Sequence, residues 1–273
     1  MVDIPQRLED LRRDGFAVFA NAVPKRQCEA VLEAIASVCR VDVDDPTTWK
    51  NISTEIDQVP LWNHQALWDI RQLPLLYDIW SRIWGRSDLW TDLNSCRVTP
   101  PIGRGGAQPL PIHLDVDPRD TSVRWFPGIV ALTDARAEEG GFCCAPSMID
   151  DSSTWPDQWP TSKYGVEYRP DTTGHETIEV PLQQGDPLIF DSRLPHGTVP
   201  NTGSEPRAVF YVQQHPAGTE PERGTRLADL EAGLCPPWWR WKPGHDQPQT
   251  CDPVLTELGS RLYGKATWTS LPG

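Results

Sequence analysis

Hydrophobic side chains recur at helical spacing through the first part of the chain. Val31, Ile35 and Val38 form one apolar stripe. Pro24 lies at the start of this segment, and proline is common in the first turn of a helix. Pro74 lies inside a later segment of the same kind and should kink or divide it. The pattern predicts helices from residue 5 to Gly15, over 24–40 and over 64–84, a short strand over 16–19, and a polar loop over 45–63.

The pattern changes after Gly85, where short runs of β-forming residues alternate with Pro, Gly, Asp and Asn. These runs cover 89–98, 111–116, 124–132, 141–145, 177–182, 187–190 and 209–213. Such spacing is typical of a sandwich or barrel. Helical patterns return over 226–233 and near 253–263. The chain is therefore predicted to be mainly β with flanking α-helices, as one domain: a mainly helical part over 1–85, a β core over 86–215 and a helical cap over 216–273.

Composition narrows the possible partners and the compartment. The net charge is −13, whereas a nucleic-acid or anionic-membrane surface needs clustered Lys and Arg. The first residues contain no apolar signal segment, and no run approaches the roughly 18 apolar residues of a membrane span. The 7 cysteines are an odd number and include no C-x-x-C pair. We expect a cytoplasmic protein with reduced thiols that binds no nucleic acid and no membrane.

The run PIHLDV contains a candidate pair of metal ligands. On a strand, His113 and Asp115 would project to one side and Leu114 to the other. His196, in the run LPHGTVP, can supply a second imidazole from a distant strand. Two histidines and one carboxylate on one face of an octahedron leave positions open and suit Fe(II), whereas a structural zinc site is closed by four protein ligands.

Arg207 adds a second chemical requirement. It lies eleven residues after His196 and begins the apolar run Ala208–Val212. Its charge cannot be removed by deprotonation, so it needs an anionic partner, and its guanidinium group matches a carboxylate. The residues alone thus point to a metal centre with an organic acid beside it.

Together these motifs resemble the phytanoyl-CoA dioxygenase family of 2-oxoglutarate oxygenases. The resemblance covers roughly residues 8–215 and rests on the spaced His-x-Asp, His and Arg; supporting motifs are L11-R-R-D14-G15-F16, G140-G141-F-C-C-A145-P146-S147, G185-D-P-L-I-F190 and H196-G-T198. It implies a double-stranded β-helix, a cupin-like jelly roll. It also implies that His113, Asp115 and His196 bind iron and form the catalytic centre.

The resemblance further implies the cosubstrate and the reaction. Arg207 would hold the distal carboxylate of 2-oxoglutarate, with Thr198 as a second hydrogen-bond donor. With O2, the enzyme would hydroxylate, desaturate or cyclise a small-molecule metabolite and release succinate and CO2, as enzymes of secondary metabolism do. Two alternatives stay open: a cupin-type metalloenzyme with another cosubstrate, and a non-catalytic β-sandwich binding protein. Oligomeric state is not indicated.

The substrate-binding residues are the least specified part of the site. Polar or aromatic residues near the predicted core are candidates for substrate contacts: Asn94, Arg97, Arg104, Gln108 and Trp155. The other tryptophans before the β core are expected mainly in the hydrophobic core. The remaining histidines, in polar or loop-like settings, are expected at the surface: His64, His175, His215 and His245.

Overall fold

A computed structural model describes residues 2–42, 45–51, 59–101, 109–117, 120, 122–136, 139–149, 168–240, 245, 248–249 and 252–268. Its N-terminal part is helical, as predicted. The elements are α1 (Ile4–Asp14), β1 (Phe16–Val18), α2 (Lys25–Cys39), a 3-10 helix (Pro46–Asn51), α3 (Gln65–Arg71) and α4 (Pro74–Trp84). Pro74 divides the predicted third helix because it starts α4, where its missing N–H costs nothing.

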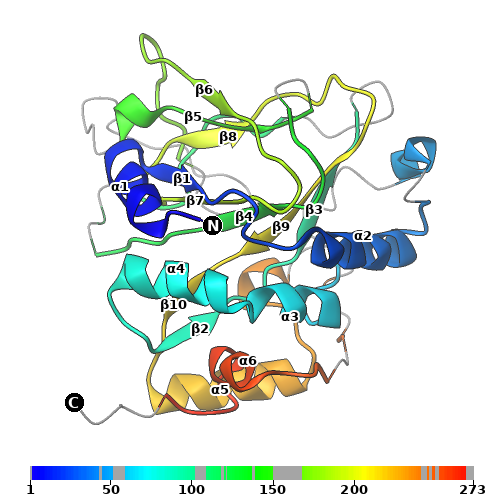
Figure 1. Cartoon of the computed structure of the whole chain (residues 1–273), viewed down its shortest axis with the longest axis vertical. Coiled ribbons are helices and arrows are strands. Elements are labelled where there is room, and N and C mark those ends of the chain that lie inside the picture. The colour runs from blue at the N-terminus through cyan, green and yellow to red at the C-terminus, as the bar shows by residue number, and fades with distance from the viewer. Residues whose placement is uncertain are drawn as a thin grey trace.

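Two antiparallel sheets form the core. The larger has the strand order β1-β7-β4-β9-β3 and the smaller β6-β5-β8. The strands of the larger sheet beyond β1 are β3 (Cys96–Thr99), β4 (Gly128–Ala131), β7 (Pro187–Phe190) and β9 (Arg207–Val212). Those of the smaller sheet are β5 (Phe142–Cys144), β6 (Ile178–Val180) and β8 (His196–Thr198). The smaller sheet lies above the larger one in Figure 1, and this is the predicted jelly-roll architecture.

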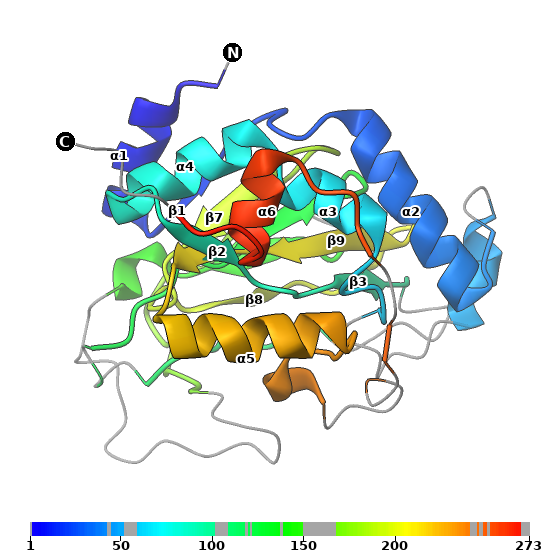
Figure 2. The same cartoon turned by 90° about the horizontal axis from the view of Figure 1, so that it is seen from below.

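Alternation along β9 gives the larger sheet two different faces. Ala208, Phe210 and Val212 pack with buried side chains of the N-terminal helices. Val209 and Tyr211 pack instead with residues of the smaller sheet, and we call this side the inner face. Figure 2 shows α2, α3 and α4 on one side of the larger sheet and β8 on the other. The sheet is thus buried on both sides, and only the inner face looks into the jelly roll.

A third, small sheet extends the molecule towards the C-terminus. It pairs β2 (Leu89–Thr91) with β10 (Gln214–Pro216), next to α5 (Glu220–Glu231) and α6 (Glu257–Tyr263). A 3-10 helix (Pro237–Trp239) follows α5. Helix α5 starts earlier than predicted because Thr219 and Glu222 form a capping box. No helix in the described part of the chain is long and apolar enough to cross a membrane.

Some predicted strands were wrong in extent. The run 89–98 is two strands, β2 and β3, which belong to different sheets. The run 111–116 forms only isolated bridges at His113 and Leu114. Strands β8 and β10 were missed because three-residue segments that contain Gly or Pro carry little hydrophobic pattern.

The turn before β7 requires a glycine because the backbone of a distant residue lies close to it. Gly185 has φ +93°, and a Cβ there would meet the carbonyl oxygen of Val23. Gly185→Ala should therefore lower the free energy of unfolding by well over about 1 kcal/mol, measured by urea denaturation. Gly174→Ala is the matched control, since Gly174 has φ +83° with nothing within 4 Å of the added Cβ. Equal losses in the two variants would show that the contact with Val23 is unimportant.

Candidate metal centre

A reciprocal backbone pair brings the two predicted histidine ligands together. His113 N–H donates to the carbonyl oxygen of His196, and His196 N–H donates to that of His113, both at 2.9 Å. The two residues therefore lie directly opposite each other in an antiparallel bridge, where side chains point to the same side. Their ring centroids are 4.6 Å apart. A separation of more than eighty residues in the chain is thus closed by one pair of hydrogen bonds.

Asp115 completes the group on the same side. Its carboxylate oxygens lie 3.5 Å from His113 Nε2 and 3.7 Å from His196 Nε2. Leu114, between His113 and Asp115 in sequence, is buried and packs with Tyr168. Among the described residues, these three form the group whose donor atoms all lie within 4.8 Å of one another.

Backbone carbonyl groups fix both imidazole rings in the tautomer that keeps the lone pair on Nε2. His113 Nδ1 lies 2.9 Å from the carbonyl oxygen of Pro111, and His196 Nδ1 lies 2.9 Å from that of Leu194. A carbonyl only accepts, so each Nδ1 carries the hydrogen and each Nε2 keeps its lone pair. Backbone carbonyls in this position typically orient metal-binding histidines. The donor set therefore fits a divalent metal ion.

The charges at the group favour the metal-binding protonation states. Burial lowers the pKa of His196 to about 4, with Asp115 acting in the opposite direction. Loss of hydration works against the charged form of Asp115, but the adjacent His196 and His113 outweigh it and lower the pKa of that carboxyl. At neutral pH, His196 is a neutral imidazole and Asp115 an anion, which are the forms that bind metals.

Aromatic side chains enclose the buried ligand. The ring of His196 stacks on Phe142 with centroids 5.6 Å apart, and Phe190 lies at 4.3 Å. Both phenylalanines belong to the inner cluster between the sheets. His196 is only 8% exposed, whereas the Asp115 side chain is more open. The site therefore has one dry wall and one accessible side.

Arg207 lies inside the jelly roll with an unsatisfied nitrogen. Arg207 pairs with Thr99 between β3 and β9. It lies two residues before Val209 on the same strand, so its side chain is on the inner face as well. It is 3% exposed, and its buried Nε has no hydrogen-bond partner within the described part of the chain. Burial lowers the pKa of Arg207 to about 10, so the group is still charged at neutral pH. A buried guanidinium with a free donor calls for an anionic ligand.

Thr198 is on the inner side of β8, two residues after His196. Its Oγ1 accepts from Leu110 N–H at 2.9 Å, which leaves the hydroxyl hydrogen available. Its own backbone N–H donates to the carbonyl oxygen of Leu110. Thr198 can therefore donate one hydrogen bond to a ligand between the sheets.

The predicted substrate contacts are not gathered in one place. Asn94 Oδ1 accepts from Trp239 Nε1 at 3.0 Å, beside α5. Arg97 is buried on the inner face, where its charge acts on Arg207. Arg104, Gln108 and Trp155 lie outside the described residues. The expectation that tryptophans serve the core is confirmed for these buried side chains: Trp49, Trp62, Trp68, Trp80 and Trp90.

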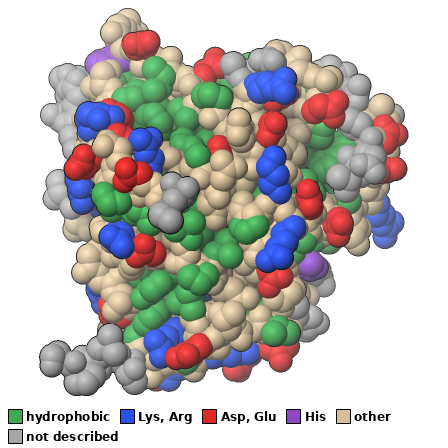
Figure 3. Space-filling model, in the orientation of Figure 1, with side chains coloured by type: hydrophobic (Ala, Val, Ile, Leu, Met, Phe, Trp, Pro, Cys, Tyr) green, Lys and Arg blue, Asp and Glu red, His purple; other side chains and the backbone are tan. Residues whose placement is uncertain are grey.

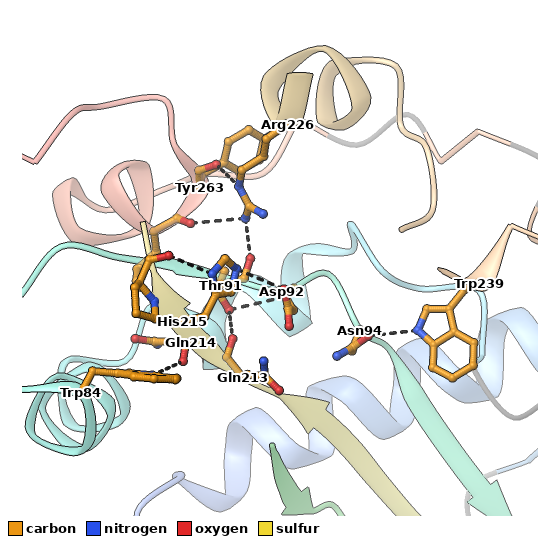
Figure 4. Close-up of polar contacts among 12 residues, drawn as sticks. Trp84, Thr91, Asp92, Asn94, Gln213, Gln214, His215, Arg226, Trp239 and Tyr263 are labelled. Atoms are coloured by element: carbon orange, nitrogen blue, oxygen red, sulfur yellow. Dashed lines mark hydrogen bonds and ion pairs between the residues drawn. The ribbon is translucent and has the colours of Figure 1, made fainter. Parts of the chain in front are cut away.

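The expectation that the other histidines are exposed was partly wrong. His245 is 3% exposed and stacks on Trp62, because a polar sequence context does not reveal packing by a distant aromatic ring. His215 is partly buried and lies 3.2 Å from Asp92. Its ring packs edge-on against Trp90 and Trp125, and Figure 4 shows it beside Asp92. The polar sequence around His215 does not reveal these contacts with distant residues.

The family model for phytanoyl-CoA dioxygenase (PhyH) matches residues 11–209. The match covers well over half of the chain. The chain belongs to this family of iron- and 2-oxoglutarate-dependent oxidoreductases. Curated proteins offer no match to the sequence.

Solved structures support the fold of this family member. The epimerase SnoN, in complex with Fe3+, alpha ketoglutarate and nogalamycin RO, is 16% identical with a TM-score of 0.55 over 78% of this chain and 84% of SnoN. The carbocyclase SnoK from nogalamycin biosynthesis is 19% identical with a TM-score of 0.52 over 81% of this chain and 90% of SnoK. EvdO2 from Micromonospora carbonacea var. aurantiaca, complexed with 2-oxoglutarate, is 19% identical with a TM-score of 0.52 over 79% of this chain and 92% of EvdO2.

The metal-free protein should lose stability between pH 6.5 and about 4. The pKa of His196 rises from about 4 in the folded protein to about 6.5 on unfolding, so the unfolded chain binds more protons in this window. The stabilisation is present above pH 6.5 and falls by up to about 3 kcal/mol as the pH falls through the folded pKa.

Urea unfolding in the presence of EDTA measures this effect. His196→Gln should flatten the dependence, whereas His175→Gln, which removes a histidine beside Ser147, should keep it. If the free energy of unfolding of His196→Gln depends on pH as strongly as that of the natural chain, burial of His196 does not cause the loss of stability.

Proposed function

We propose that this family member is an Fe(II)- and 2-oxoglutarate-dependent dioxygenase that hydroxylates, desaturates or cyclises a small-molecule metabolite. The observation that carries the proposal is the convergence of His113, Asp115 and His196, with buried Arg207 on the facing sheet. Bound iron would couple the oxidative decarboxylation of 2-oxoglutarate to oxidation of the substrate, with succinate and CO2 as co-products.

In this proposal the three ligands hold the metal on one side. Two Nε2 atoms and one carboxylate leave the remaining positions to the cosubstrate and O2. The carbonyl oxygens of Pro111 and Leu194 keep both imidazoles in the metal-binding tautomer. The chain thus contributes a prearranged ligand set.

Arg207 is proposed to hold the distal carboxylate of 2-oxoglutarate, with Thr198 as a second donor. The buried guanidinium group can neutralise that carboxylate. Its Nε–H group, which has no acceptor among the described residues, can donate a hydrogen bond to a carboxylate oxygen. Phe142 and Phe190 exclude water from the side of His196. A cupin-type enzyme without an organic-acid cosubstrate has no use for such a residue.

Charge and the structural relatives support a small-molecule substrate. The net charge is −13, and acidic and basic side chains are interspersed on the face seen in Figure 3. A nucleic-acid ligand would need a continuous basic surface. SnoN is an epimerase and SnoK a carbocyclase, so we extend the possible outcomes beyond hydroxylation. We also propose that the enzyme acts in the cytoplasm.

Anaerobic titration tests the two halves of the site separately. Fe(II) with 2-oxoglutarate should give a weak visible absorption band, which should vanish in Asp115→Ala because a metal ligand is lost. Arg207→Ala should weaken the affinity for 2-oxoglutarate by about a hundredfold, because a buried charge pair is broken.

Arg12→Ala, an exposed arginine on α1, is the control and should titrate like the natural chain. Absence of the band in the natural chain would reject the proposed function. An unchanged 2-oxoglutarate affinity in Arg207→Ala would reject the role of Arg207.

A further inference from the structure

Backbone hydrogen bonds hold Trp125 at the end of the larger sheet. Its N–H donates to Ser192 Oγ at 3.0 Å, and its carbonyl oxygen accepts from Ser192 N–H at 3.0 Å. Phe190 N–H donates in the same way to the carbonyl oxygen of Pro127. The antiparallel pairing of β4 with β7 therefore continues beyond both strands as far as Trp125 and Ser192.

The indole of Trp125 lies on the inner face of this sheet. The next residue, Phe126, packs with the helix-covered cluster on the outer face, and the guanidinium group of Arg124 lies over its ring at 5.4 Å. Ile129 belongs to the inner cluster. Side chains alternate along a strand, so Trp125 projects to the side of Ile129 and away from Phe126.

The metal ligand His196 is close to the same part of the sheet. The ring centroid of Phe190 lies 4.3 Å from that of His196, and Trp125 pairs two residues, about 7 Å, beyond Phe190. One short segment also connects the two side chains. Ser192 pairs with Trp125, and the carbonyl oxygen of Leu194 lies 2.9 Å from His196 Nδ1. The indole therefore has a fixed position relative to the metal ligand.

Arg207 lies at the other end of this face. The pairing of β4 with β9 places Arg207 opposite position 133, and Ala208 N–H donates to Thr133 Oγ1 at 3.0 Å. The order along the inner face is therefore Arg207, the level of the metal ligands and then Trp125. The cosubstrate is proposed to extend from Arg207 to the metal, so Trp125 is on the side that remains for the substrate.

The indole is both accessible and rigid. Trp125 is 40% exposed, and its ring makes an edge-to-face contact with His215, with centroids 6.1 Å apart. The neighbouring Arg124 forms an ion pair with the buried Asp191. A rigid aromatic side chain loses little entropy when a ligand packs on it. A flat ring can contact the whole face of an indole, whereas a puckered saturated ring touches it at fewer atoms.

We propose that Trp125 is a substrate-binding residue and that an aromatic ring of the substrate stacks on its indole. The stacked ring holds an adjacent carbon of the substrate at the metal. The inference rests on the proposed function, because it names the recognised group of the substrate of that oxidation.

2-Naphthol and decahydro-2-naphthol test the class of ligand, since they share a carbon skeleton and a hydroxyl group but only the first is flat. Equilibrium dialysis with metal-free protein should show saturable binding of 2-naphthol and about tenfold weaker binding of the saturated alcohol.

Variants of Trp125 test the place. Trp125→Ala should weaken 2-naphthol binding about tenfold because the stacking surface is lost, whereas Trp125→Phe keeps an aromatic ring and should weaken it by about threefold or less. Val254→Ala is the control, since Val254 is an apolar side chain that is 78% exposed and lies outside the sheets. It should bind 2-naphthol like the natural chain.

Anaerobic NMR spectra with Fe(II) and 2-oxoglutarate test whether the bound ring is near the metal. The iron should broaden the 2-naphthol signals with the natural chain and with Val254→Ala, and much less with Trp125→Ala. The visible Fe(II)–2-oxoglutarate band should persist in Trp125→Ala, because the metal ligands and Arg207 are unchanged. A residue with a purely structural role would instead lose the band together with the binding.

The proposal would be overturned by any of five results: no saturable 2-naphthol binding, equal affinity for the two alcohols, natural affinity in Trp125→Ala, equal losses in the Ala and Phe variants, or no broadening while the band is present. The dialysis contains no metal. A missing band in the natural chain, with 2-naphthol binding that still depends on Trp125, therefore rejects the proposed function alone.

Discussion

The backbone pair between His113 and His196 is the constraint on which the site depends. Residue 113 lies in a segment without regular strand structure, and β8 is only three residues long. Two reciprocal hydrogen bonds nevertheless set the imidazoles side by side, and alternation then places Asp115 with them. Because the bridge is part of the backbone, the geometry of the ligands is determined before any metal binds.

The surrounding jelly roll protects this arrangement. The outer face of the larger sheet is covered by helices, so its inner face can be used for chemistry. Arg207 and His196 project from facing sheets into the same interior, and aromatic rings keep water from one side.

The sequence predicted the parts of this account that depend on local pattern. The spacing of His113 and Asp115 placed both on one side, and Arg207 at the start of an apolar run implied an anionic partner. Pro74 was expected to kink or divide its helical segment, and it divides the segment by starting α4. The family resemblance was confirmed by the family match.

The rest depends on contacts between distant segments. No local pattern shows that Trp62 would bury His245, or that β2 and β3 would join different sheets. Such features arise from packing of elements far apart in the chain.

The central claim is that His113, Asp115 and His196 together bind one iron ion. A crystal grown anaerobically with Fe(II) and 2-oxoglutarate, measured at the iron absorption edge, tests it most directly. The account predicts one anomalous peak at bonding distance, about 2.1 Å, from Nε2 of both histidines and from an Asp115 oxygen. A peak elsewhere, or one that lacks any of these three ligands, would contradict it.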